Sequence, residues 1–466
     1  MSAAVSGAGI QRKTPLSCLR RRFHRVPALL AGLCLAGAAQ AQHFAPKSLA
    51  DKTVRPEVRL AFTRLLAAPV VQRTLDAVRD DHLNTIDDLR LLTEIEAPPF
   101  KERKRAEAFL ARLKALGLTD AYIDGEGNVL ALRKGRGNGP TLLVSAHLDT
   151  VFPAGTDVRV RERDGRLYAP GISDDTRGLT VLLSWLRVLN EQKVQTEGDL
   201  LFAASVGEEE LGNLRGMKRI FAEHPEIDGM VGLEPAPDGS VLVGGTASRR
   251  HEIVFSGPGG HSFGAFGRVP SAIHGMGRAI AKIADLKTPS LPRTTFTVGT
   301  ASGGTAVNAI AAEARMAIDI RSDAPAELRM LERRIFDAVD AAVREENARA
   351  RADTLRATHR WVGERPGGRT PSDAVIVEAA VRANASVGLR TLLRGGSTDA
   401  NVPMALGIPA IVVGGGGLTG GFHALDEWID LHEAWRGAQN SLLTVLGLVG
   451  VQQVSAPLLA KRLPAN

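Results

Sequence analysis

Short apolar stretches that lead to a residue able to bind a metal ion recur along this chain, and this pattern restricts the folds open to it. The residues in question are His147, Asp174, Glu209, Glu234 and His423. Residues 141–146 lead directly into His147, for example, and residues 227–233 lead into Glu234. Apolar runs of this length predict buried strands, and in an open α/β sheet ligands bind beyond the carboxyl ends of the strands. The sequence therefore predicts one site built from residues far apart along the chain.

The first 41 residues have the pattern of a removable export signal, which changes how the composition is interpreted. Basic residues from Arg12 to Arg25 precede an apolar segment at 26–38, and Ala39-Gln40-Ala41 is a small-residue cleavage site. The apolar segment is too short to span a bilayer. This leader carries six positive charges and no negative one, so the net charge of +7 falls to +1 after cleavage. The basic composition is therefore no argument for a nucleic-acid partner.

Both cysteines, Cys18 and Cys34, lie in the leader, so we expect the mature chain to contain neither a disulfide nor a thiolate metal site. Arg20-Arg21-Arg22 is compatible with twin-arginine export and with ordinary secretory export. No later segment is long and apolar enough to be a transmembrane helix. These features predict a periplasmic or secreted protein without a membrane span.

The rest of the chain predicts two structural units, one inserted into the other. Helical and strand-like runs alternate up to about Gly245, beginning with helical patterns at 58–89 and 101–116. This alternation predicts an α/β domain with an open mixed sheet and helices on both faces. The expected boundaries are a signal peptide at 1–41, a first part of the α/β domain at 42–247, the insert at 248–363 and a second part at 364–466.

The insert has its own predicted order of elements. Its expected strands are at 251–256, 294–300, 314–320 and 354–361, and its expected helices at 271–286 and 326–349. The resulting order β-α-β-β-α-β is the ferredoxin-like arrangement. Residues 364–368 are expected to form the linker back to the α/β domain. Because Glu234 precedes the insert and His423 follows it, the predicted site uses both halves of the split domain.

Each motif on its own has an ordinary structural interpretation. Asp174 and Asp175 could cap the helix that follows them, and the acidic run that starts at Glu208 could be a solvated edge. The histidines His147 and His423 could be ordinary strand-end and loop residues. The combination favours a metal site, because neighbouring buried carboxylates repel one another unless cations neutralise them.

A pair of Zn²⁺ ions would match this set in charge and ligand type. Asp174, Glu209 and Glu234 supply three negative charges, and a bridging hydroxide would supply the fourth. Oxygen ligands combined with neutral imidazoles suit zinc, with cobalt or manganese as substitutes. If the preceding strand continued through Glu208 and Glu209, their side chains would point to opposite sides, so that one could bind metal while the other faced a substrate.

Taken together, the motifs resemble those of a known enzyme family. They are Ser145-Ala146-His147-Leu148-Asp149-Thr150-Val151, Gly171-Ile172-Ser173-Asp174-Asp175, Gly207-Glu208-Glu209, Gly232-Leu233-Glu234-Pro235, Gly259-Gly260-His261-Ser262 and Gly420-Gly421-Phe422-His423. In this order they are similar to the dizinc metallopeptidase family of peptidase T, glutamate carboxypeptidase, aminoacylase and succinyl-diaminopimelate desuccinylase. The resemblance extends from about residue 90 to 440. It departs at Thr176-Arg177, where many relatives have lysine directly after the acidic pair.

The resemblance implies how the metal ligands are shared. His147 and Glu234 would bind one zinc ion, and Glu209 and His423 would bind the other. Asp174 would bridge the two ions, since the family's bridging aspartate is the first of its pair.

The resemblance also implies roles for five further residues. Glu208 would be the general base, and Asp149 would orient the histidine ligand that precedes it. His261, supplied by the insert of a partner subunit, would stabilise an oxyanion. Asn308 and Arg321 would contact substrate, with the arginine gripping a carboxylate. On their own, His261 could be a surface histidine in a glycine turn and Arg321 could form a surface salt bridge.

The activity implied by the resemblance is zinc-dependent hydrolysis of an amide bond in a short peptide, by a homodimer whose insert is both lid and dimerisation domain. An N-acyl-amino-acid deacylase is the alternative. Glu234, where aminopeptidase relatives tend to carry aspartate, favours carboxypeptidase or deacylase chemistry, whereas the similarity to peptidase T favours attack from the amino end. A noncatalytic periplasmic binding module is a third class, but it would be expected to lose the base or a ligand, and all are present here.

Overall fold

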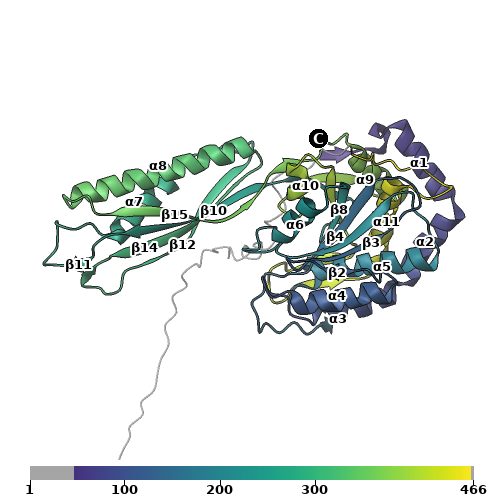
Figure 1. Cartoon of the computed structure of the whole chain (residues 1–466), viewed down its shortest axis with the longest axis horizontal. Coiled ribbons are helices and arrows are strands. Elements are labelled where there is room, and N and C mark those ends of the chain that lie inside the picture. The colour runs from purple at the N-terminus through teal and green to yellow at the C-terminus, as the bar shows by residue number, and fades with distance from the viewer. Residues whose placement is uncertain (1–46, 463–466) are drawn as a thin grey trace, which may run out of the picture. The chain divides into compact units, whose positions relative to one another are not determined.

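The computed structural model describes residues 47–462 (Figure 1). The predicted leader, its cleavage site and both cysteines therefore lie outside the described residues. Among the residues that are described, no helix is both long and apolar enough to cross a membrane.

A large mixed sheet carries the predicted site. Its strands follow the order β1-β17-β9-β18-β8-β4-β7-β3-β2, and β16 pairs with β9. Their bounds are β1 Lys47–Leu49, β2 Tyr122–Ile123, β3 Val129–Arg133, β4 Thr141–His147, β7 Asp199–Ser205, β8 Ile227–Glu234, β9 Ser240–Gly245, β16 Gly368–Arg369, β17 Thr391–Gly396 and β18 Ala410–Gly414. Strand β4 runs parallel to β7 and β8, and β8 runs parallel to β18. The carboxyl ends of these central strands therefore lie at one edge of the sheet.

Helices cover both faces of this sheet, as the alternation of side chains along β4 shows. Leu142 and Val144 are buried in one apolar cluster, whereas Leu143 is buried in another. The first cluster includes residues of α1 (Pro56–Ala67), α2 (Pro69–Asp80), α4 (Arg103–Ala115), α5 (Arg177–Glu191), α9 (Val375–Ser386) and α11 (Trp435–Val449). The second includes residues of α6 (Arg215–Glu223) and α10 (Asn401–Ala405). Because successive side chains of a strand point to opposite faces, the two clusters lie on opposite faces of the sheet, and each contains helices. The predicted fold class, an open mixed sheet with helices on both faces, is therefore confirmed.

The amino-terminal helical region packs on the sheet domain. The pattern at 58–89 forms three helices, α1, α2 and α3 (His82–Thr93). Helix α1 ends before Pro69, because proline has no backbone N–H with which to continue it, and Pro69 is the first residue of α2. Phe62, Leu65 and Val71 are fully buried in the larger apolar cluster. The helix predicted at 101–116 is α4, which begins two residues later and ends one residue earlier than predicted.

The inserted unit has the predicted β-α-β-β-α-β order (Figure 1). Its main elements are β10 (Ala247–Ser256), α7 (Ala272–Ala284), β12 (Thr294–Gly303), β14 (Glu313–Ser322), α8 (Pro325–Arg349) and β15 (Arg356–Arg365). The strands form an antiparallel sheet in the order β12-β14-β10-β15, with Phe255, Ile318 and Ile335 in its core. The linker predicted at 364–368 is wrong at its start, because Arg365 still pairs with Ser248 inside the sheet. The domain boundaries themselves stay predictions.

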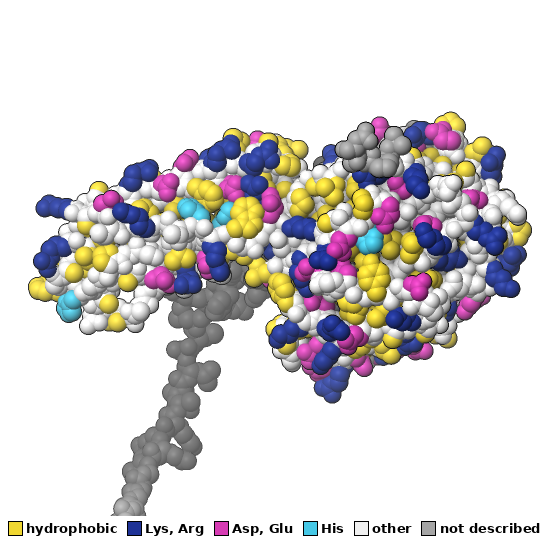
Figure 2. Space-filling view, viewed as in Figure 1, with side chains coloured by type: hydrophobic (Ala, Val, Ile, Leu, Met, Phe, Trp, Pro, Cys, Tyr) yellow, Lys and Arg dark blue, Asp and Glu magenta, His cyan; other side chains and the backbone are white. Residues whose placement is uncertain are grey.

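Two small groups of strands complete the parts of the fold that matter here. β19 (Leu418–Gly420), β20 (Trp428–Asp430), β6 (Arg166–Tyr168) and β5 (Arg161–Arg163) form a separate sheet, and His423 lies in the loop between β19 and β20. In the insert, β11 (Gly260–His261) pairs with β13 (Ala309–Ile310). On the face shown in Figure 2, basic and acidic side chains are interspersed.

Candidate metal centre

The five predicted ligands come from different segments that meet near the carboxyl ends of β4, β7 and β8. His147 is the last residue of β4, and Glu234 is the last residue of β8. Glu209 lies in the loop that follows β7. Asp174 lies within η2 (Ile172–Thr176), directly before α5, and its own backbone angles are not helical. Together with His423 from the β19–β20 loop, these residues converge although 276 positions separate the first from the last.

Two groups of potential ligands share Asp174. The Nε2 atom of His147 lies 3.0 Å from Oδ1 of Asp174 and 3.9 Å from Oε2 of Glu234. The Nε2 atom of His423 lies 3.3 Å from Oδ2 of Asp174 and 3.1 Å from Oε1 of Glu209. In each group the ligand atoms lie within 4.8 Å of one another, so each could hold one metal ion. The two oxygens of Asp174 face different histidines, which is the arrangement that a bridging carboxylate needs.

The pKa values of these groups indicate a pocket that favours added positive charge. Burial raises the pKa of Glu234 well above the ordinary glutamate value. Burial would act in the same direction on Asp174, but hydrogen bonds from His147 and His423 outweigh it and lower its pKa. Hydrogen bonds to Asp174 and Glu209 raise the pKa of His423 to about 10. Carboxylates this close together ionise readily only when cations lie among them.

Asp149 contacts the ring of His147 through its main-chain carbonyl. Nδ1 of His147 donates to the main-chain carbonyl of Asp149 at 2.9 Å, whereas the Asp149 carboxylate is 3.8 Å away. That carboxylate instead accepts hydrogen bonds from the backbone N–H groups of Glu208 at 3.2 Å and Glu209 at 2.8 Å. One residue thus fixes the ring of a predicted ligand and the loop that carries the predicted base. Nε2 of His147 is left to face the acids.

The predicted base does not lie on a continuing strand. Strand β7 ends at Ser205, and Gly207 has a φ of 75°, a backbone conformation that favours glycine. The condition for alternating Glu208 and Glu209 side chains, a strand that continues through both residues, is therefore not met, because a turn separates them from β7. The Glu208 side chain is buried and its Oε1 lies 3.0 Å from Nη1 of Arg365. His147, Glu208 and Glu209 also form a group whose atoms lie within 4.8 Å of one another.

Glu427 supports the site and was missed from the sequence. One of its carboxylate oxygens accepts from the backbone N–H of Ser173 at 2.8 Å, the hydroxyl of Ser173 at 2.6 Å and the N–H of Asp174 at 3.0 Å. The other accepts from the N–H of Gly171 at 3.0 Å. Glu427 is fully buried, so its carboxylate holds the loop that presents Asp174. The sequence signal for a role of Glu427 in the site is its position four residues after the predicted ligand His423.

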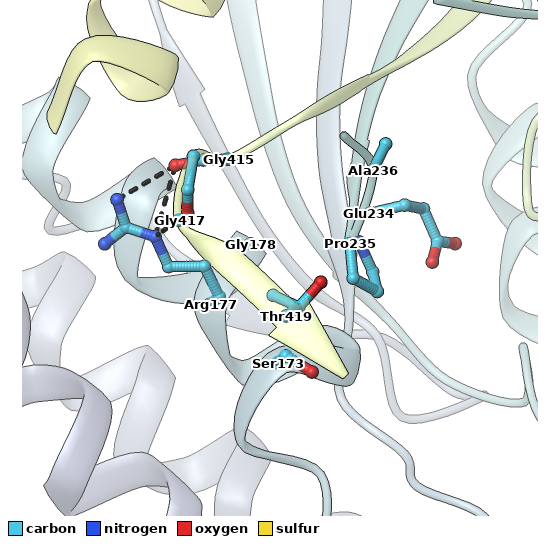
Figure 3. Close-up of a pocket in the computed structure, with 10 residues that line it drawn as sticks. Ser173, Arg177, Gly178, Glu234, Pro235, Ala236, Gly415, Gly417 and Thr419 are labelled. Carbon is cyan, nitrogen blue, oxygen red and sulfur yellow. Dashed lines mark hydrogen bonds between the residues drawn. The ribbon is translucent and has the colours of Figure 1, made fainter. Parts of the chain in front are cut away.

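Arg177, where the chain departs from the resemblance, is also part of this region. Its guanidinium is buried and donates to the carbonyls of Gly415 at 2.9 Å and Ala434 at 3.2 Å. Figure 3 shows Arg177 bound to the glycine run, with Glu234 on the other side of a pocket. The volume of this pocket is about 10 Å³, about the space that one water molecule needs. Arg177 therefore ties the start of α5 to the segment that leads to His423.

The three predicted residues of the insert lie outside the groups that could hold metal. His261 is exposed on β11, and the N–H of Ser262 donates to the carbonyl of Asn308 at 3.0 Å, so the structure brings His261 and Asn308 together. Arg321 lies on β14, and its Nε is 2.6 Å from Oδ2 of Asp319. The ion pair that the sequence left open for Arg321 is thus present. The contacts of His261, Asn308 and Arg321 with a substrate or a partner subunit stay predictions.

The fold is an open α/β sheet with an inserted ferredoxin-like unit. It carries two histidine–carboxylate groups that share an aspartate. Together these features define a scaffold of the metallohydrolase class. The chain belongs to the peptidase family M20/M25/M40, whose model matches residues 143–446. Members of this family act on amide bonds as peptidases and amidohydrolases, and this protein is a hydrolase of that kind.

Several individual proteins are similar to this chain. YqjE of Bacillus subtilis (strain 168), an uncharacterized protein, is 25% identical over 348 residues, which cover 70% of this chain and 90% of that protein. Carboxypeptidase G2 of Pseudomonas sp. (strain RS-16) is 29% identical over 232 residues, 45% of this chain and 55% of the relative. The crystal structure of aminopeptidase PepT from Bacillus cereus ATCC 10987 has a TM-score of 0.65 at 21% identity and covers 78% of this chain and 97% of its own. At that identity the structural likeness shows the fold alone.

Proposed function

We propose that this protein is a zinc-dependent metallopeptidase that hydrolyses the amide bond of short peptides, as an exopeptidase or a di- or tripeptidase. The observation that carries the proposal is the pair of ligand groups sharing Asp174. Sites that combine imidazole and carboxylate ligands suit zinc, with cobalt or manganese as substitutes.

The residues fit a dinuclear centre. His147 and Glu234 would hold one ion, Glu209 and His423 the other, and Asp174 both. Nδ1 of His147 donates to a carbonyl, which leaves the Nε2 lone pair for a metal. The raised pKa of the buried acid Glu234 also supports a bound metal ion, since a cation would favour the ionised form of this side chain.

The chain's own residues would perform the proton transfers and hold the substrate. Bound at this site, two zinc ions would acidify a water molecule and polarise the substrate carbonyl. Glu208 accepts the proton of the attacking water and returns it to the departing amine. His261 from the insert of a partner subunit would donate to the oxyanion, and Asn308 and Arg321 would hold the free terminus of the substrate.

A second candidate is hydrolysis of N-acyl amino acids, which breaks the same kind of bond. Glu234 favours it, because aminopeptidase relatives tend to have aspartate at this position. A noncatalytic binding module is less well supported, since Glu208 and all five ligands are present and close together. We further propose that the protein is a homodimer and that residues 1–41 direct it to the periplasm or outside the cell.

The proposed function is tested by removing and restoring the metal. Chelation should abolish hydrolysis of dipeptides and tripeptides, and zinc should restore it, with cobalt or manganese as weaker substitutes. Restored activity on N-acetyl or N-succinyl amino acids alone would support the deacylase instead. No hydrolysis of any amide by the zinc-loaded protein would reject both.

Glu208→Gln separates the base from the metal ligands. The variant should keep its metal content but lose turnover by about 10²–10⁴-fold, because a general base contributes rate enhancement of that order. Glu210→Gln is the matched control, since the Glu210 side chain is exposed in the same acidic run. Turnover that survives in Glu208→Gln would remove Glu208 from the mechanism.

A further inference from the structure

Arg365, the last residue of β15, contacts the proposed base at two points. Its Nη1 lies 3.0 Å from the carboxylate of Glu208, and its Nη2 donates to the main-chain carbonyl of the same residue. Arg365 is only 7% exposed, and Nη1 also lies 3.3 Å from the hydroxyl of Ser397. A planar guanidinium can hold two acceptors in one fixed geometry, which a lysine ammonium cannot do.

The strand that carries Arg365 belongs to the insert. Arg365 pairs with Ser248 at the end of the insert's sheet, next to the point where both strands return to the α/β domain. The arginine therefore joins the loop that carries the base to the strands on which the insert is mounted.

Neighbouring contacts join the same two parts of the protein. The side chain of Asn213, in the loop after β7, accepts from the N–H of Glu364 at 2.7 Å. Lys218 donates to the carbonyl of Glu364 at 2.7 Å, and Arg250 donates to the carbonyl of Glu210. The segment around Glu208 is thus bound to β10 and β15 at several places. Arg365 is the member of this set that reaches the carboxylate of the base.

We propose that Arg365 is a positioning residue that sets the orientation of the Glu208 carboxylate and couples it to the base of the insert. The inference rests on the proposed hydrolase function, because it assigns Arg365 to the step in which Glu208 accepts a proton. In that role Arg365 touches neither metal nor substrate. Its loss should therefore affect turnover while metal content and substrate affinity change little.

The test compares Arg365→Lys and Arg365→Ala with Arg360→Ala in the metal-loaded protein. Arg360 lies on the same strand, is exposed and pairs with Glu252 at 2.9 Å, so its removal should leave kcat unchanged. We expect kcat to fall about 10²-fold in Arg365→Ala, the order of loss that a small misplacement of a reacting group causes. The fall should be smaller in Arg365→Lys, with KM within about threefold of the wild-type value in both variants.

Two further measurements separate positioning from a structural role. Added guanidinium should restore part of the turnover of Arg365→Ala, and a crystal structure of Arg365→Lys should show the Glu208 carboxylate displaced with the metal ligands in place. In a Glu208→Gln background the Arg365→Lys change should cost little more turnover, because the two residues act as a unit.

Four outcomes would overturn the proposal. They are unchanged kcat in both variants, a fall in kcat that follows loss of metal, equal losses in the wild-type and Glu208→Gln backgrounds, and an unmoved Glu208 in the variant crystal. If the wild-type protein hydrolyses no amide, the proposed function fails instead. If the wild-type protein is active and the Arg365 variants have the same kcat, only the role of Arg365 is rejected and the proposed function is unaffected.

Discussion

Several residues that bind no metal in the proposed centre decide where its ligands point. Asp149 holds the ring of His147 with its carbonyl and the Glu208-Glu209 backbone with its carboxylate. Glu427 holds the loop of Asp174 in the same manner. Partners of this kind typically change metal affinity or activity by 10–100-fold when they are removed.

At the residue scale, Glu427→Ala should weaken metal binding by about 10–100-fold, because Ser173 and Asp174 lose the acceptor that holds their N–H groups. Competition with a metal-sensitive chelator measures the change. Asp426→Asn is the matched control, since Asp426 is exposed and directly adjacent. Equal metal affinity in Glu427→Ala and the wild type would show that the loop holds its shape without this carboxylate.

At the scale of elements, the two helices of the insert are joined by one buried acid. Glu346 of α8 accepts from the N–H of Ser271, which caps α7, at 3.0 Å and from Nη2 of Arg349 at 2.6 Å. Its side chain is fully buried, and Arg278 of α7 approaches its other oxygen to 3.3 Å. Burial would raise the pKa of Glu346, but the hydrogen bonds from Arg349, Ser271 and Arg278 outweigh burial and lower it.

Glu346→Gln should therefore destabilise the insert by about 1–3 kcal/mol at neutral pH, as expected when a buried charged acceptor is lost. A carboxylate whose pKa is lowered by folding stabilises above its ordinary pKa, and this stabilisation is lost as the pH falls through the lowered value. The difference between wild type and variant should thus shrink below about pH 4. Hydrogen exchange of α7 and α8 amides measures it, with Asp337→Asn, an exposed acid of the same helix, as the control. A difference that grows in acid would contradict this account.

At the scale of the whole molecule, the proposed dimer places His261 of one subunit in the site of the other. His261→Ala and Glu208→Gln should each be inactive as homodimers. Mixed dimers should recover activity, because one of their two sites then combines an intact base with an intact partner histidine. Mixing the two variants under conditions that exchange subunits, followed by a peptide assay, measures the recovery. Mixtures as inactive as their components would place His261 outside the partner's site.

The main strands, the order of elements in the insert and the family of this protein follow from patterns in its sequence. The apolar runs before His147 and Glu234 are buried strands, and the element order of the insert is the one its periodicities predict. Such patterns are informative because burial on a strand or a helix leaves a characteristic spacing of apolar residues. The family follows from the order of the motifs, and the match to residues 143–446 confirms it.

Only the tertiary structure decided how the ligands are held. Glu427, Arg177 and Arg365 act through hydrogen bonds to residues that lie 157 to 257 positions away in sequence. The turn at Gly207, which removes Glu208 from its strand, is likewise fixed by long-range contacts with Asp149. Hydrogen bonds between distant segments leave no periodic trace along the chain, because they depend on where the folded elements meet and not on the spacing within any one of them.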